Sequence, residues 1–162
     1  LLQAERPPAA SADQPISEVH FSPGDGCRLR IQELLREART TVDICVFTMT
    51  DDRITEAVID AAARGVKMRA ISDNDKSLDP GSDMRRLHAA RILVRLDRTP
   101  NHMHHKFAVF DGNIVVSGSY NWTRSAAEDN EENIVVTNDP KIVRAFDRQF
   151  ELLWPQMVPI LG

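Results

Sequence analysis

Apolar positions along the chain switch between the spacing typical of strands and that typical of helices. Strands are predicted at 16–21, 40–50 and 66–72, the second as a β-branched apolar run suited to a buried strand. Segments 27–38 and 51–65 instead repeat apolar residues at the three- and four-residue spacing of an amphipathic helix. This β-α-β-α-β alternation predicts an α/β fold with a mixed, largely parallel sheet flanked by helices.

Polar and special residues at the ends of the second helix support its limits. Asp51 or Asp52 can accept hydrogen bonds from the first N–H groups of the helix. Gly65 follows the last apolar position and suits the left-handed conformation that ends many helices. We therefore expect the helix to begin near Asp51 and to end at Gly65.

The second half of the chain predicts a β-hairpin between further helices and strands. Its two apolar runs, 104–110 and 114–119, are separated by Asp-Gly-Asn, and Asp-Gly tolerates the positive φ angles of a tight turn. The closing helix is expected to pack Ile142, Ala145, Phe146 and Phe150 inward. The other expected elements are helices at 83–90, from 121 and at 139–154, strands at 92–96 and 132–137, and loops at 73–82 and 97–101.

A single folded domain at 16–162, preceded by a flexible linker at 1–15, fits the length and composition. The chain has 162 residues, 42% of them hydrophobic and 27% charged, which argues against disorder and fibrous architectures. Its opening is rich in Pro, Ala and polar residues without a period, and it begins with Leu, so it reads as a linker after a removed segment. With no apolar run of 18 residues, this sequence predicts no membrane span and leaves the compartment open.

Charge is distributed unevenly along the chain. The net charge is -4, yet residues 64–106 contain ten Lys or Arg and five Asp or Glu. Four of the five histidines lie in the same block. One surface could therefore attract anions although the whole protein is acidic, and an ordinary solvated face is the competing interpretation.

Three histidines and a lysine crowd into residues 102–106, at the start of the predicted hairpin. Because side chains alternate along a strand, His104 and Lys106 should share one face. Two such groups side by side repel and lose solvation unless an anion such as phosphate binds them. The second strand brings Ser119 and Asn121 to the same edge, at the start of a helix whose free N–H groups could also hold an anion.

A metal site is the rival interpretation of these histidines. His102 and His104 lie two residues apart, but no Cys and no group of Asp or Glu nearby completes a ligand set. Lys106 would also repel a cation. We therefore expect no metal and no cofactor; Cys27 and Cys45 are too few for a zinc site or a disulfide framework.

The hairpin resembles the HKD signature of the phospholipase D superfamily. His104, Lys106 and Asp111 meet H-x-K-x4-D, and Gly118, Ser119 and Asn121 meet the trailing G-S-x-N. The resemblance covers about residues 15–154 and is strongest to members with one motif per chain, among them bacterial endonucleases and the mitochondrial cardiolipin hydrolase. The Cys/His zinc cluster of the eukaryotic branch has no counterpart in "SPGDGCRLR".

The resemblance implies a metal-independent phosphodiesterase that works as a homodimer. His104 of one subunit would attack phosphorus to form a phosphohistidine, and His104 of the other would protonate the leaving oxygen and then activate water. Lys106 and Asn121 would stabilise the phosphoryl oxygens, with Ser119 adding a hydrogen bond.

The remaining motif residues receive supporting roles in the same resemblance. Asp111 belongs to the catalytic signature but is expected to organise the turn, five residues from Lys106. Glu132 could orient His104 and fix its tautomer, with Glu131 as the competing assignment. The substrate-binding candidates are Gly118, His102 and Arg98. His105 and Trp122 are expected to pack in the interior.

Substrate class is open in the sequence. The basic block favours single-stranded nucleic acid, because phosphate contacts dominate affinity for nucleic acids. Hydrolysis of cardiolipin or another phospholipid is the alternative, with membrane attachment through a removed N-terminal segment. A non-catalytic module that binds nucleic acid or lipid is the third hypothesis, which the complete set of motif residues disfavours.

Overall fold

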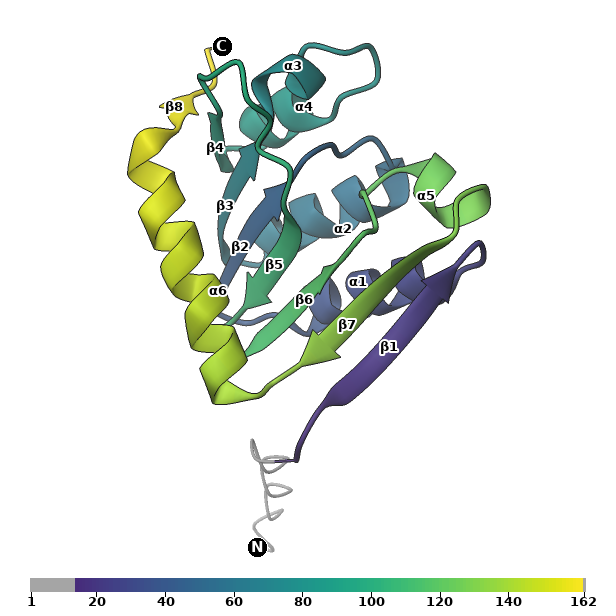
Figure 1. Cartoon of the computed structure of the whole chain (residues 1–162). Helices are drawn as coiled ribbons and strands as arrows, with labels where there is room; N and C mark the ends of the chain where they lie inside the picture. Colours follow the sequence, from purple (N-terminus) through teal and green to yellow (C-terminus); the bar gives the residue numbers. More distant parts are fainter. Residues whose placement is uncertain (1–13, 162) are drawn as a thin grey trace, which may run out of the picture.

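An eight-stranded sheet forms the centre of the protein, in a computed structural model that describes residues 14–161 (Figure 1). The strand order is β1-β7-β6-β5-β2-β3-β4-β8. The strands are β1 (Ser17–Ser22), β2 (Thr41–Val46), β3 (Lys67–Ser72), β4 (Leu93–Leu96), β5 (Lys106–Phe110), β6 (Ile114–Gly118), β7 (Glu132–Thr137) and β8 (Val158–Pro159). The predicted linker at 1–15 lies outside the described residues except for Gln14 and Pro15.

Helices cover both faces of this sheet. They are α1 (Gly26–Glu37), α2 (Asp52–Ala63), α3 (Asn74–Ser77), α4 (Met84–Ala89), α5 (Arg124–Glu128) and α6 (Pro140–Leu153), followed by the 3-10 turn η1 (Trp154–Gln156). α1 and α2 lie on one face and α6 on the other (Figure 1). No described helix is long and apolar enough to cross a membrane.

The α/β class with a mixed sheet is confirmed, although the parallel part is smaller than expected. Among the strands of the described residues, only β2–β3 and β3–β4 pair in parallel. The pairings β2–β5, β5–β6, β6–β7, β1–β7 and β4–β8 are antiparallel. The hairpin β5–β6 joins the sheet with β5 antiparallel to β2. Beyond the hairpin, β7 is antiparallel to β6, and β1 is antiparallel to β7.

Local signals in the sequence correspond to the observed ends of elements. The Asp51 side chain accepts a hydrogen bond from Arg53 N at 3.1 Å, which confirms the start of α2. Gly65, which follows the C-cap residue Arg64 of that helix, has φ +97°. In the hairpin turn, Asp111 and Gly112 have φ values of 53° and 66°, as the Asp-Gly pair predicted.

Several elements differ from the sequence-based expectation. The loop expected at 73–82 contains the short helix α3, and the two-residue strand β8 was not predicted. α6 buries Val143 and Phe150, whereas Ile142 is 43% exposed and Ala145 is also exposed. On α6, Val143 and Phe150 pack in the core, and Phe146 packs against it partly buried. The prediction of inward packing is therefore wrong for Ile142 and Ala145.

Candidate active site

The predicted site residues other than Asp111 gather at the end of the sheet where β2, β3 and β6 finish and β5 and β7 begin. Lys106 opens β5 and lies opposite Val46, the last residue of β2. Ser119 follows the end of β6, and Glu132 opens β7. The strand begins at Lys106, so His104 and His105 lie in the irregular segment just before it. His105 is exposed there, so the expectation that it packs in the interior is wrong.

His104 and Lys106 are in direct contact, as their two-residue spacing predicted. Lys106 Nζ donates to His104 Nδ1 at 3.0 Å and to the His104 carbonyl oxygen at 2.7 Å. Because an ammonium group only donates, Nδ1 acts as the acceptor and a neutral ring then has its proton on Nε2. In this tautomer Nε2 can donate its proton to a substrate oxygen. Attack on phosphorus by Nε2 requires the other tautomer, with the proton on Nδ1, so Lys106 Nζ must release Nδ1 before that step.

Phe47 forms the wall behind this pair. Its ring centroid lies 4.5 Å from that of His104 and 5.3 Å from that of His102. Lys106 Nζ is 5.4 Å and Lys76 Nζ 5.8 Å from the same centroid. Two imidazoles and two ammonium groups therefore surround one aromatic ring at the end of β2.

Electrostatics favours the neutral form of His104. Loss of solvation lowers the pKa of His104, the charges of Lys106 and His102 lower it further, and Asp73 partly opposes them. Burial also lowers the pKa of Lys106, which Glu132 partly opposes. A neutral imidazole beside an ammonium group is suited to nucleophilic attack on an anionic phosphodiester.

Gly118 is explained by packing, and its predicted role in substrate binding stays a prediction. A Cβ on this residue would lie 2.1 Å from the carbonyl oxygen of Asn133, so β6 and β7 approach too closely for any side chain. Ser119 continues the contact: its N–H donates to Asn133 O and its Oγ accepts from Asn133 N, both at 3.1 Å. The Ser119 hydroxyl is thus engaged with β7.

Asn121 lies before α5, and the expected anion cradle at that helix is not found. α5 has five residues, and Thr123 Oγ1 already accepts from Ala126 N at 3.1 Å. The buried Oδ1 atom of Asn121 has no hydrogen-bond partner within residues 14–161. Trp122 is 1% exposed, which confirms that it packs in the core.

Glu132 lies close enough to influence Lys106, but the predicted contact with His104 is not made within one chain. Glu132 raises the pKa of Lys106 against the effect of burial. No hydrogen bond or ion pair joins Glu132 to His104 in the described part of the chain; Lys106 holds the Nδ1 atom that Glu132 was expected to bind.

Asp111 does not belong to the site, although the motif includes it. It follows Phe110 at the far end of β5, about 16 Å from Lys106 at the usual rise of a strand. Its carboxylate accepts hydrogen bonds from the backbone N–H groups of Arg39, Thr40 and Thr41 at 2.7 to 3.1 Å. Asp111 therefore ties the hairpin turn to the start of β2, and its inclusion among catalytic residues is wrong.

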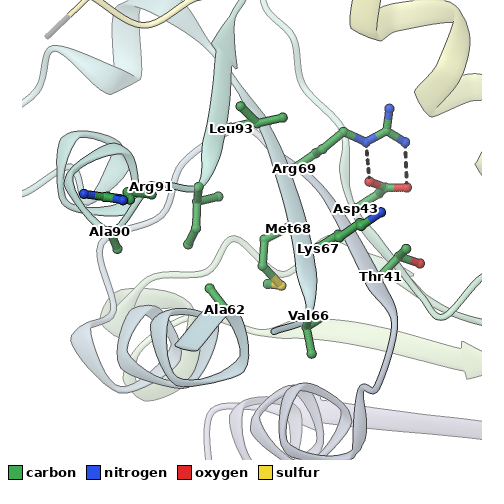
Figure 2. Close-up of a pocket in the computed structure, with 11 residues that line it drawn as sticks. Thr41, Asp43, Ala62, Val66, Lys67, Met68, Arg69, Ala90, Arg91 and Leu93 are labelled. Atoms are coloured by element: carbon green, nitrogen blue, oxygen red, sulfur yellow. Dashed lines mark hydrogen bonds and ion pairs between the residues drawn. The ribbon is translucent and has the colours of Figure 1, made fainter. Parts of the chain in front are cut away.

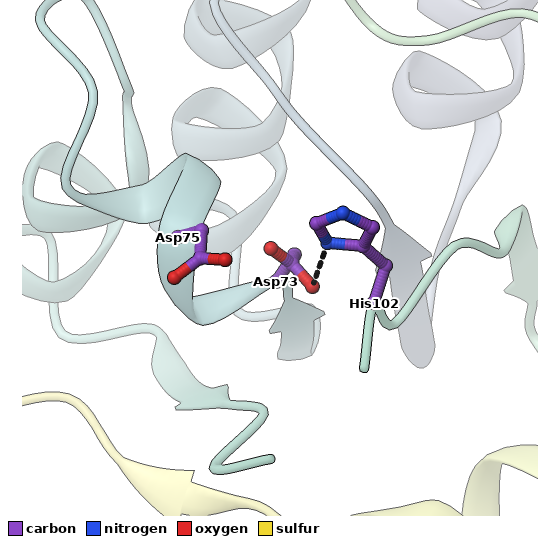
Figure 3. Close-up of side chains that lie close together, drawn as sticks. All are labelled: Asp73, Asp75 and His102. Carbon is purple, nitrogen blue, oxygen red and sulfur yellow. Dashed lines mark ion pairs between the residues drawn. The ribbon is translucent and has the colours of Figure 1, made fainter. Parts of the chain in front are cut away.

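His102 lies beside two acidic residues that sequence reasoning missed. Ligand atoms of His102, Asp73 and Asp75 lie within 4.8 Å of one another, and His102 Nδ1 is 3.5 Å from Asp73 Oδ1 (Figure 3). A signal was present, because Asp73 directly follows β3, and functional groups often follow the carboxyl ends of parallel strands. Arg98 is exposed in the loop between β4 and β5.

The basic block of the sequence is divided between two ends of the sheet. Lys76 and Lys106 lie at the site. Lys67, Arg69 and Arg91 instead line a cavity of about 620 Å³ at the opposite end, where Arg69 is paired with Asp43 (Figure 2). Lys67 pairs with Thr41, and Lys106 pairs with Val46, five residues farther along β2. The block therefore does not form one basic surface.

Fold and motif together define a phospholipase D-like domain, and comparison with known proteins supports this class. The family described as "Cardiolipin synthase, PLD-like domain" matches residues 31–154. The solved structure described as a phospholipase D family member, Nuc from Salmonella typhimurium, superposes with a TM-score of 0.87 at 26% identity, covering 92% of this chain and all of that one.

Curated relatives named mitochondrial cardiolipin hydrolase are similar over most of the chain. The protein from Chlamydomonas reinhardtii is 47% identical over 77% of this chain and 56% of its own length. The mouse protein is 35% identical over 98% of this chain and 71% of its own length. The chain belongs to the PLD-like domain family, within the phospholipase D superfamily, and spans little more than half of the algal relative.

Proposed function

We propose that the protein is a metal-independent phospholipase D-type phosphodiesterase, with phospholipid as its substrate class and cardiolipin as the first substrate to test. The contact between His104 and Lys106 carries this proposal. It places a neutral imidazole, a potential nucleophile, beside an ammonium group that can hold a non-bridging phosphate oxygen. The curated relatives named cardiolipin hydrolases support the lipid over nucleic acid.

The reaction needs two imidazoles with different tasks. His104 of one subunit attacks phosphorus, so that a P–N bond forms and the P–O bond to the alcohol breaks. His104 of the second subunit donates its proton to the leaving oxygen. The same group then takes a proton from water. The water oxygen attacks the phosphorus of the phosphohistidine, the P–N bond breaks, and the phosphomonoester is released. Lys106 and Asn121 stabilise the charge on the phosphoryl oxygens.

A homodimer follows from this mechanism, because one chain contains one HKD motif. The surface that supports it is the open part of the sheet formed by Val19, Phe21 and Val135, which we call the β1–β7 patch. These side chains are 52%, 66% and 47% exposed. Their strand neighbours Glu18 and Ile134 face α1, so the patch lies on the α6 face, where β1 and β7 are left uncovered (Figure 1).

The division of the basic block weakens the sequence-based preference for single-stranded nucleic acid. That preference depended on one continuous anion-binding surface, and phosphate contacts along a strand need such a surface. Nucleic acid remains the second substrate to test.

The deciding experiment compares substrates in EDTA. Turnover of cardiolipin vesicles, phosphatidylcholine vesicles, and labelled single-stranded DNA and RNA is measured side by side for the wild type and His104→Ala. We expect cardiolipin hydrolysis in the wild type and a loss of about 1,000-fold or more in His104→Ala, since the nucleophile is gone.

Each other outcome has a definite meaning. Cleavage of nucleic acid alone moves the function to a nuclease. Binding without turnover, unchanged by His104→Ala, favours the non-catalytic module. Activity lost in EDTA and restored by a divalent metal overturns the metal-independent mechanism and directs attention to Asp73, Asp75 and His102.

A further inference from the structure

His104 projects from a segment that has no regular secondary structure of its own. Residues 101–105 precede β5 and lie outside its assigned pairing with β2. A nucleophile in such a segment needs other anchors, because a misplacement of about 1 Å can cost about 100-fold in rate. The contacts of its two chain neighbours, Met103 and His105, are therefore informative.

The segment is held on both sides of His104. On the far side, the Phe47 N–H donates to the His105 carbonyl oxygen at 2.8 Å. On the near side, the buried Met103 N–H donates to Asp73 Oδ1 at 2.9 Å. The Met103 side chain is 6% exposed and its sulfur lies 3.5 Å from Cys45 Sγ in the core. His104 thus lies between two residues whose backbone groups are anchored by hydrogen bonds.

Asp73 is an unusual choice for such an anchor. Its side chain is completely buried, and burying a carboxylate costs several kcal/mol unless hydrogen bonds and charges compensate. Its partners are the N–H of Met103, the N–H of Lys76 at 3.4 Å and the ring of His102 at 3.5 Å (Figure 3). One carboxylate therefore joins the end of β3 and the start of α3 to the residues that lead to His104.

We propose that Asp73 is a positioning residue for His104: through Met103 N–H and the His102 ring, its carboxylate fixes the backbone from which the nucleophile projects. The inference rests on the proposed phosphodiesterase function and adds a residue outside the HKD motif to its machinery. Asp73 touches neither substrate nor reacting atoms, and it acts through its neighbours.

Two variants and one control separate positioning from general stability. Asp73→Ala removes the acceptor of the Met103 N–H, whereas Asp73→Asn keeps an oxygen that can accept it. The control is Asp75→Ala, since Asp75 is exposed, lies two residues away and belongs to the same acidic group. All three are compared as the full 162-residue chain, at a temperature well below the melting temperature of each variant.

The first readout is kinetic, with the substrate that the wild type turns over. Asp73→Ala should lower kcat about 100-fold and change KM less than about threefold, because the phosphate-binding Lys106 stays in place. Asp73→Asn should recover most of the rate, to within about fivefold of the wild type. Asp75→Ala should stay within about twofold. A kcat for Asp73→Ala within threefold of the wild type would overturn the inference.

The second readout does not depend on activity. In amide hydrogen exchange, the Met103 N–H of Asp73→Ala should exchange at least tenfold faster, while the Phe47 N–H stays protected. Unchanged protection of Met103 sinks the proposed anchor. Loss of protection at both amides makes Asp73 a residue of general stability. A wild type that cleaves no phosphodiester overturns the proposed function, and exchange at Met103 still decides whether Asp73 holds the segment.

Discussion

At the scale of single residues, the surroundings of His104 decide what its imidazole can do. Lys106 lies 3.0 Å from Nδ1, the ring of Phe47 lies behind it, and His102 is the next ring along. Loss of solvation and the charges of Lys106 and His102 disfavour a positive charge on the ring, and Asp73 opposes them only in part. His104 is therefore prepared to act as a neutral base or nucleophile at neutral pH.

The pKa of His104 provides a direct test. In an NMR titration of the histidine rings, we expect His104 to titrate below 6.5, its ordinary value, because of lost solvation and the charges of Lys106 and His102. Since a lowered pKa keeps the nucleophilic ring neutral to lower pH, the fall of kcat/KM on the acid side should begin only below pH 6.5.

Lys106→Met is the matched variant for this titration. Removing the ammonium group should raise the pKa of His104 toward 6.5. The variant should also lose activity, because the proposed mechanism assigns phosphate binding to Lys106. A wild-type pKa at or above 6.5, or the same pKa in Lys106→Met, would show that the pair does not tune the ring.

At the scale of elements, the hairpin β5–β6 joins two ends of the molecule with different tasks. Lys106 begins β5 at the site, and Asp111 ends it against the loop before β2. Both belong to one motif in the sequence. A motif shows which residues are needed but does not show whether each is needed for chemistry or for stability. The four residues between them are enough to separate chemistry from stability.

Asp111→Ala should therefore destabilise the fold and leave the chemistry intact. Burial raises the pKa of Asp111, but the N–H groups of Thr40, Thr41 and Arg39 outweigh it and hold the pKa below its ordinary value. Losing these charge-assisted hydrogen bonds, at a residue with φ 53°, should lower the free energy of unfolding by about 2 kcal/mol. Urea unfolding followed by tryptophan fluorescence measures it.

The pH dependence and a second variant complete this test. A carboxylate with a lowered pKa stabilises the fold above its ordinary pKa of 3.8, and the difference from Asp111→Ala should disappear as the pH falls through the lowered value. Asp111→Asn should lose less, because Asn tolerates a positive φ. Normal stability with a large loss of kcat in Asp111→Ala would return Asp111 to the active site.

At the scale of the whole molecule, exposed apolar side chains and the single motif point in the same direction. The β1–β7 patch is left open by α6. A chain with one His104 lacks the second imidazole that the proposed mechanism uses. Self-association through this patch would meet both needs, because it covers apolar surface and brings in a second His104.

Phe21→Asp should weaken this self-association. Burial of one phenylalanine contributes about 1.5–3 kcal/mol, so the dissociation constant should rise at least tenfold. The matched control is Leu29→Asp, since Leu29 is 49% exposed on α1, which packs on the other face of the sheet. Sedimentation equilibrium gives the constants. Equal constants for both variants would exclude the patch, and an active monomer would exclude the two-subunit mechanism.

The sequence by itself determined the elements and the chemistry of the motif. Periodic apolar residues predicted β1 to β7 and the longer helices, Asp51, Gly65 and Asp-Gly predicted their ends, and the spacing of His104 and Lys106 predicted their contact. These features depend on neighbours within a few residues, so local physics is sufficient to predict them.

Only the tertiary structure decided how distant segments meet. It brought Asp73 to Met103, thirty residues away, and placed Phe47 behind His104. It separated Asp111 from the site, and it divided the basic residues between two ends of the sheet. The physical reason is strand order: β5 inserts beside β2, and no local pattern specifies the pairing of strands that a tight turn does not join.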